Sequence, residues 1–176
     1  MSKKIKPSIV ALFVLIATVL ILTVYAFVWL FYSKNTFDKY TDCVPKYADL
    51  GYIGVDEQGY SYHVKTPTFP SFDGNLSISP PLGNQFVASG LIIWVGAKNE
   101  LCYGVLLEHE KETYQIVIDK NGNTVKQPNM YDETYALYKT IVDLNSDFIY
   151  ALLSKADACW GVTNGNKTDL NLKSIE

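Results

Sequence analysis

The stretch Ile9–Tyr32 constrains this chain more than any other feature, because it is an uninterrupted apolar run close to the amino terminus. It contains no charged residue, glycine or proline, and Thr18 and Thr23 are its only aliphatic polar residues. A helix over this stretch is roughly 36 Å long, which exceeds the bilayer hydrocarbon thickness of about 30 Å. The run therefore predicts a transmembrane helix over residues 8–33.

The end of the run distinguishes an anchor from a cleaved signal peptide. A cleavable signal has an apolar core of about 7–15 residues, followed by a site with small residues. Here the run is longer and ends in the aromatic residues typical of a membrane interface, Tyr25, Phe27, Trp29, Phe31 and Tyr32. We expect an uncleaved, single-pass signal anchor.

The flanking lysines predict the orientation of this anchor. Lys3, Lys4 and Lys6 precede the run, whereas Lys34, Lys39 and Lys46 follow it. The upstream charges are denser and closer, and positive flanks favour the cytoplasm. We expect residues 1–7 in the cytoplasm and the C-terminal domain outside it, at the inner membrane of a bacterium. Abundant lysine with no arginine fits AT-rich codon usage, which favours a bacterial source.

The charge of the downstream part limits its partners. All 18 acidic residues and 12 of the 15 lysines follow the span, which gives that part a net charge of −6. Nucleic-acid binding begins with phosphate neutralisation, so a nucleic-acid partner is not expected. The lack of arginine also argues against phosphate or carboxylate recognition by bidentate contacts.

Hydrophobic patterns predict an α+β fold: the N-terminal transmembrane helix, then a small domain with an antiparallel β-meander and C-terminal helices packed on one face. Residues 34–50 are expected to form a helical connector, in which the spanning helix runs to about Asp42 and a short helix starts at Pro45. Residues 51–162 form the extracytoplasmic domain. The polar residues 163–176 are expected to form a flexible tail.

The expected strands lie in the first two thirds of the domain. Short β-type runs occupy Tyr52–Val55, Tyr60–Lys65 and Leu76–Ser79, and three longer ones form a meander between Gly90 and Val125, with Asn121-Gly122 as a hairpin turn and a short last strand at Thr124-Val125. Leu91–Val95 is apolar at every position, which predicts a strand buried on both faces.

The expected helices follow between Tyr131 and Ala158. An apolar stripe predicts the face that packs on the sheet, and its members are Leu137, Ile141, Leu144, Phe148 and Leu152. Asn145-Ser146-Asp147 is expected to break this region and cap a second helix, and Gly161 to end it.

Three cysteines permit at most one intrachain disulfide. Cys43 and Cys159 each lie near the end of an expected helix, whereas Cys102 lies within a strand. An exported domain therefore favours a Cys43–Cys159 bridge, and unpaired, buried cysteines are the alternative.

No motif predicts an enzyme, and we expect no catalytic residue, cofactor or metal site. His63 and His109 are the only histidines, and neither lies in a recognisable catalytic or metal-binding pattern. The acidic turn around Glu108 and Glu110 fits a solvated surface, and Asp119 begins a turn that lacks the EF-hand spacing.

We instead expect a binding protein with a protein partner. The irregular segment Thr66–Asn84 is long enough to be a binding loop, in which Phe69, Phe72 and Leu82 either cover the core or form an exposed apolar patch. The residues expected to contact a partner are Tyr60, Tyr62, Phe69, Phe72, Glu108 and Glu110.

The layout resembles that of small bacterial immunity proteins that neutralise toxins arriving outside the inner membrane, although no residue motif carries the resemblance. The leading hypothesis is a membrane-anchored, immunity-type protein that binds a toxin. The alternative is a non-catalytic accessory subunit of an envelope complex, against which the span's lack of a Gly-xxx-Gly pattern and of charges argues mildly.

Overall fold

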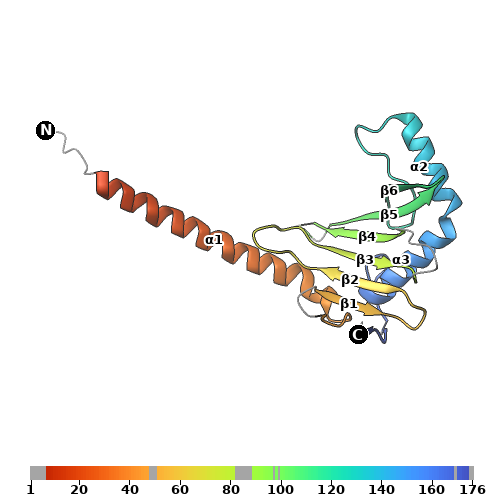
Figure 1. Cartoon of the computed structure of the whole chain (residues 1–176), viewed down its shortest axis with the longest axis horizontal. Helices are drawn as coiled ribbons and strands as arrows, with labels where there is room; N and C mark the ends of the chain where they lie inside the picture. Colours follow the sequence, from red (N-terminus) through yellow and green to blue (C-terminus); the bar gives the residue numbers. More distant parts are fainter. Residues whose placement is uncertain are drawn as a thin grey trace.

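A computed structural model describes residues 7–47, 51–81, 89–96, 98, 100–168 and 170–174. The elements in chain order are α1 (Pro7–Thr41), β1 (Tyr52–Val55), β2 (Ser61–Lys65), β3 (Asn75–Ser79), β4 (Gly90–Val95), β5 (Leu101–His109), β6 (Glu112–Ile118), α2 (Asp132–Leu144), α3 (Ser146–Trp160) and β7 (Lys173–Ser174). The long helix α1 projects from a domain in which α2 and α3 lie on one side of a sheet (Figure 1). This arrangement confirms the predicted α+β class.

Helix α1 is continuous over 35 residues, which corresponds to about 52 Å. Its apolar side chains are exposed along the part that projects from the domain; Phe13 is 67% and Leu20 60% exposed. Such a surface is unfavourable in water, because every apolar side chain on it remains hydrated. In length and composition, α1 is able to cross a membrane.

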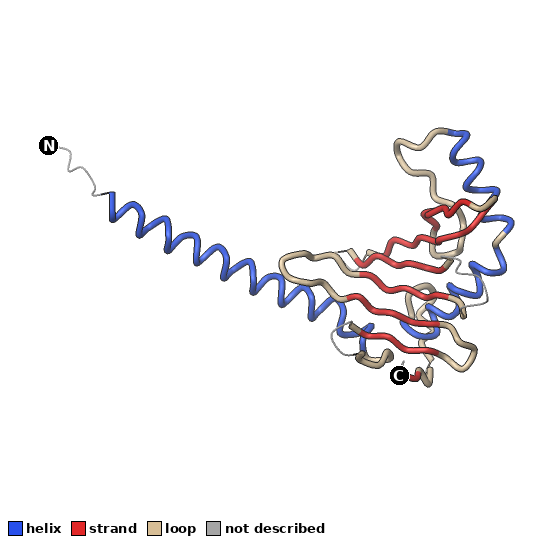
Figure 2. The backbone as a smooth tube through the Cα atoms, viewed as in Figure 1, coloured by secondary structure: helices blue, strands red, loops and turns tan. Residues whose placement is uncertain are grey.

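The sheet has seven strands in the order β6-β5-β4-β3-β2-β1-β7, and every neighbouring pair is antiparallel. Strands β1 to β6 form a simple meander (Figure 2). The short strand expected at Thr124-Val125 is reduced to one bridge between Ile118 and Thr124.

Part of the expected flexible tail is held against the domain. Lys173 pairs with Val55 at the free edge of β1, so that the chain end adds strand β7 to the sheet. Asp157 on α3 binds the start of the same segment, because its carboxylate accepts the backbone N–H groups of Thr163, Asn164 and Gly165 at 2.8, 2.9 and 3.2 Å. Neither contact was predicted, because the polar composition of residues 163–176 is typical of a flexible tail.

The core lies between the helices and one face of the sheet. Its fully buried side chains from the strands are Tyr62, Val64, Leu76, Ile78, Leu91, Ile93, Val105 and Ile116, and those from the helices are Ile141, Leu152, Ala156 and Cys159. Burying one large aliphatic side chain stabilises a fold by about 1.5–3 kcal/mol. The meander is therefore held mainly by this single apolar layer.

The C-terminal turns of α1 belong to the same core. Phe37 and Tyr40 are 1% and 4% exposed, and the Trp160 indole N–H donates a 3.1 Å hydrogen bond to the Tyr40 carbonyl oxygen. The predicted continuation of the spanning helix to about Asp42 is confirmed, since α1 ends at Thr41. This segment packs as a structural part of the domain rather than as a linker.

The short helix expected from Pro45 does not form over residues 45–47. Lys46 instead makes an antiparallel bridge with Tyr52, and the Ile53 N–H donates to the Pro45 carbonyl oxygen at 2.9 Å. Pro45 is thus part of an extended segment that returns the chain to β1. The rest of the expected helix, residues 48–50, lies outside the described residues.

The predicted break between two C-terminal helices is confirmed at Asn145. Its side chain does not cap α3 but donates to the Ile141 carbonyl oxygen at 2.8 Å. The predicted apolar stripe is correct for Ile141 and Leu152 but not for Leu137 and Leu144, which are 40% and 69% exposed. Helix α2 buries Ile141 and Val142, and half-buried Tyr138 also packs against the core.

The turn of the β5–β6 hairpin holds two residues in the left-handed backbone region, which neither residue type prefers. Glu110 and Lys111 have φ values of 51° and 69°. Two-residue hairpins favour Asn-Gly at such positions, because other side chains are strained by about 1–2 kcal/mol per residue.

We predict that the double change Glu110→Asn with Lys111→Gly stabilises the protein by about 1 kcal/mol, because it relieves this strain. Urea unfolding of the full chain in detergent micelles measures the effect. The pair Glu110→Gln with Lys111→Gln removes the same charges without relief and serves as the control. Equal stability of the two variants would contradict a strained turn.

Candidate partner-binding surface

The sheet face opposite the core forms the candidate surface. Cross-strand pairs align one row of residues over six strands, namely Ile53, His63, Ser77, Ile92, Gly104 and Val117. Among the described elements, no helix covers this face, and its side chains are mostly half-buried. We call the side of the sheet that carries these six residues the open face.

Trp94 is the largest side chain on this face. It pairs with Asn75 on one side and Cys102 on the other, and its ring lies against Gly104. A Cβ atom on Gly104 would be 2.6 Å from the indole ring, so glycine is what allows the ring to lie flat on the sheet. The result is a flat aromatic surface flanked by Ile92 and Val117.

A cleft of about 660 Å³ continues this surface toward α1. Val28 and Tyr32 line it from α1, and Trp94, Asn75 and Lys65 from the strands. The Tyr32 hydroxyl donates to the Val95 carbonyl oxygen at 3.3 Å, which closes one end of the cleft. The cleft therefore joins the helix to the open face with aromatic, amide and ammonium groups.

Phe69 and Phe72 lie in the loop between β2 and β3, which extends along α1 (Figure 2). They contact the aromatic side chains of α1 and neither cover the core nor lie on the open face. Leu82, the third member of the expected patch, lies outside the described residues. Phe72 also lines the cleft beside Trp94, so the loop borders the open face at its α1 end.

Tyr60 immediately precedes β2 and lies next to an ion pair that links the β1–β2 turn to α3. The Lys155 ammonium lies 4.0 Å from the Tyr60 ring centroid and 2.7 Å from the Asp56 carboxylate. Tyr60 is half-buried under this lysine. The Lys155 side chain links α3 to the β1–β2 turn and covers one face of the Tyr60 ring. Little of the Tyr60 ring is therefore available to a partner.

Tyr62 is not available as a partner contact. It is fully buried and points into the core, with its ring 5.9 Å from that of Trp160 and its hydroxyl donating to Asp56 at 3.0 Å. Burial, together with the negative charge of Asp56, raises the pKa of Tyr62 above its ordinary value. The alternation of the strand places Tyr62 on the core face, whereas His63 is on the open face.

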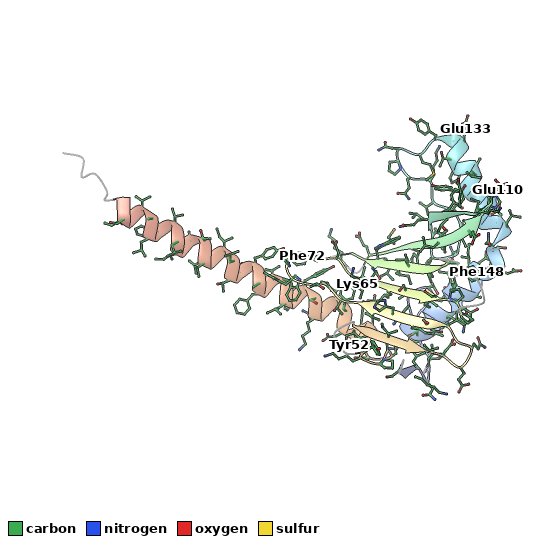
Figure 3. The ribbon with its side chains drawn as sticks, viewed as in Figure 1. Tyr52, Lys65, Phe72, Glu110, Glu133 and Phe148 are labelled. Carbon is green, nitrogen blue, oxygen red and sulfur yellow. The ribbon has the colours of Figure 1, made fainter. Side chains whose placement is uncertain are left out.

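Glu108 and Glu110 are exposed on the β5–β6 hairpin, as the expected acidic turn requires. Figure 3 shows Glu110 at the opposite end of the domain from Phe72. The six residues expected to contact a partner therefore do not form one site.

Cys43 and Cys159 lie together, as the sequence analysis expected for a disulfide pair. Their Sγ atoms are 3.0 Å apart, and the Cys43 thiol also lies 3.1 Å from the Cys159 carbonyl oxygen. The hydrogen bond from Cys159 lowers the pKa of Cys43 and raises that of Cys159. Cys102 is exposed on the open face, beside Trp94.

The described residues contain no group of three or more His, Cys, Asp or Glu side chains that would hold a metal ion. Within the described structure, the Nε2 atom of His63 is buried without a hydrogen-bond partner. Asp119 binds the amides of its own turn, at Asn121 and Asn123.

The open face was not predicted, because Leu91–Val95 is apolar at every position. That pattern predicted burial on both faces, but Ile92 and Trp94 are only half-buried and point away from the core. The useful signal was Gly104, ten residues after Trp94 in the next strand, which leaves room for a cross-strand indole.

Comparisons with protein-family models, with curated proteins and with solved structures found no significant match.

The ion pair between Asp56 and Lys155 makes the stability of the fold depend on pH. Burial raises the pKa of Asp56, but the hydrogen bonds from Lys155, the Tyr60 amide and the Tyr62 hydroxyl outweigh it, so the pKa is lowered. A carboxylate with a lowered pKa stabilises the fold above its unfolded pKa, near 4, and that stabilisation is lost as the pH falls through its folded value.

We predict that Asp56→Asn destabilises the protein by about 2 kcal/mol at pH 7, because it removes a charged acceptor of several hydrogen bonds. The difference should shrink as the pH falls from the unfolded pKa, near 4, through the lowered folded pKa of Asp56. Urea unfolding at pH 7 and pH 3 tests this. Asp143→Asn, which breaks an exposed pair with Lys139, is the matched control and should change little. A loss that is equal at pH 7 and pH 3 would contradict the electrostatic origin.

Proposed function

We propose that this chain is a membrane-anchored binding protein, in which α1 is the anchor and the open face of the sheet receives a protein partner. The observation that carries the proposal is the half-buried aromatic platform of Trp94 on Gly104, flanked by Ile92 and Val117. Large flat aromatic side chains on rigid elements supply much of the energy at protein interfaces. Antiparallel sheets commonly keep one face for the core and leave the other accessible.

The finer form of the proposal is an immunity-type role, in which the domain binds a toxin on the outer side of a bacterial inner membrane and neutralises it. The negative charge of the domain favours a basic partner, because opposite charges speed association. An accessory role in an envelope complex is the alternative. It differs in that α1 itself would make specific contacts in the membrane.

Co-purification tests this function. The full chain, extracted from its native membrane in mild detergent, should retain the product of a neighbouring toxin gene, and cells that express the chain without the toxin should grow normally. The same cells should survive the toxin. Replacing only residues 9–24 of α1 by an unrelated apolar stretch, which leaves the turns that pack on the domain unchanged, should preserve protection. Loss of function on this exchange would favour the envelope-complex role, and absence of both a binding toxin and protection would refute the immunity role.

We predict that Trp94→Ala weakens binding of the co-purified partner by at least tenfold, because removal of a central aromatic contact typically costs about 2 kcal/mol or more. Tyr131→Ala is the matched control, since Tyr131 is 82% exposed at the start of α2 and remote from the sheet face. Titration of the detergent-solubilised chains measures both affinities. Equal loss in the two variants, or none in either, would contradict docking on the open face.

We also propose that Cys43 and Cys159 form a disulfide when the domain lies outside the cytoplasm. The Cys43 thiolate attacks a disulfide carried by a thiol–disulfide oxidoreductase and releases one of its sulfurs as a thiol. Cys159 then loses its proton and displaces the second sulfur, so that two protein thiols are oxidised while one oxidant disulfide is reduced. The lower pKa of Cys43 makes it the attacking thiol.

We predict one alkylated cysteine per chain, Cys102, when membranes are denatured without reductant and treated with a polymer-linked maleimide. Reductant should raise the number to three. The Cys102→Ser variant should have no alkylated cysteine without reductant and two with it. Three adducts without reductant would contradict the bridge.

A further inference from the structure

We infer that the β2–β3 loop, residues 66–74, is a second membrane contact that lies in the interfacial layer of the bilayer beside α1. This inference does not depend on the partner proposal; it requires only that α1 spans a membrane. Its basis is the position along α1 at which the loop touches the helix.

Four edge-to-face ring pairs join the loop to α1. Phe69 contacts Tyr25 and Trp29 with ring centroids 5.9 and 5.5 Å apart, and Phe72 contacts Tyr25 and Tyr32 at 5.6 and 5.2 Å. Figure 3 shows Phe72 beside the helix, away from the body of the sheet. The loop is thus packed on the helix over two turns.

The depth of this contact follows from the length of the apolar run. A helix crosses a hydrocarbon layer of about 30 Å in about 20 residues, so a span that starts at Ile9 reaches the outer boundary near Val28. Tyr25 lies about one turn inside this boundary. Helical side chains point toward the amino terminus, so the Tyr25 hydroxyl group lies still deeper in the membrane.

Moving the span along the helix does not remove the loop from the membrane. A shift toward the carboxyl terminus, up to Tyr32, buries the loop more deeply. A shift toward the amino terminus is limited by Lys6, Lys4 and Lys3, whose charges are unfavourable in hydrocarbon. In each case the Phe69 end of the loop lies at the level of the interface or below it.

The backbone of the loop is suited to a layer with little water. Pro67 and Pro70 have no N–H group to satisfy, and the Ser71 N–H donates to the Thr68 carbonyl oxygen at 2.8 Å. Helix α1 satisfies two further groups, since the Tyr25 hydroxyl donates to the Pro70 carbonyl oxygen at 2.6 Å and the Trp29 indole N–H to that of Ser71 at 2.7 Å. Unpaired carbonyl groups are costly in lipid, so these bonds favour insertion.

The side chains of the loop also fit the interface. Phe69 remains 50% exposed despite its contacts with α1, and aromatic rings are enriched at the headgroup level of membranes. The only charge in residues 66–74 is that of Asp73, which lines the cleft between α1 and the strands and accepts the Ser71 hydroxyl at 2.8 Å. The contact should therefore form on zwitterionic lipid and need no anionic headgroup.

Spin labelling of the full chain in phosphatidylcholine vesicles tests this contact. A nitroxide is attached at Phe69→Cys in a Cys102→Ser background, and the background chain alone corrects for labelling at Cys43 or Cys159. Power saturation then compares collisions with oxygen, which concentrates in lipid, and with a nickel chelate, which stays in water. Leu20→Cys provides the in-membrane reference and Glu133→Cys, at the far end of the domain, the aqueous one.

We expect the oxygen-to-nickel ratio at position 69 to exceed that at position 133 severalfold and to approach that at position 20. Thr68→Cys repeats the test on an exposed neighbour, in case the loss of the Phe69 ring displaces the loop. Ratios at 68 and 69 equal to that at 133 would overturn the inference and leave the aromatic patch for a protein partner. Low collision rates with both reagents would also overturn it, because they mean burial within protein. A water-like ratio at position 20 would refute the span itself, whatever the result for the open face.

Discussion

The packing of the last turns of α1 into the core is the interaction on which the rest of the structure depends. Phe37 fills a space that only glycine leaves open, since a Cβ atom on Gly74 would lie 2.4 Å from its ring and 2.7 Å from the Lys65 carbonyl oxygen. The hydrogen bond from Trp160 to Tyr40 joins the same turns to the end of α3. The helix that is able to cross a membrane is therefore also a core helix of the domain, and the helix and the domain cannot move independently without opening the core.

The sequence was sufficient wherever one segment carries its own signal. The length of Ile9–Tyr32 predicts α1, and Asn121-Gly122 predicts a tight turn in which Gly122 has a φ of 87°. The break at Asn145 and the end at Gly161 follow from local residue preferences. The proximity of Cys43 and Cys159 was predictable because each lies near the end of a helix.

Features that depend on the partner of a segment were not predictable in this way. Tyr62 and His63 are neighbours in one strand, and only the position of α3 decides that Tyr62 is in the core. The periodicity of α2 shows an apolar stripe but not how far the sheet extends beneath it, so Leu137 and Leu144 were wrongly placed in the core. Pro45 is compatible with a helix start, but pairing with β1 is the arrangement that satisfies its carbonyl group.

The contacts of α1 lie at two levels, and in the proposed arrangement, with α1 across a bilayer, they fix the orientation of the open face relative to that bilayer. The aromatic contacts at Tyr25 and Tyr32 and the buried contact at Tyr40 span about 22 Å of helix, so a rotation of the domain about either level would break the other. The cleft between Tyr32 and Trp94 consequently stays at the level of the lipid headgroups. A partner that enters it meets aromatic rings there and small polar side chains, such as Ser77, further from the membrane. Such a partner must therefore approach along the membrane surface and present its own most apolar contact nearest to the lipid.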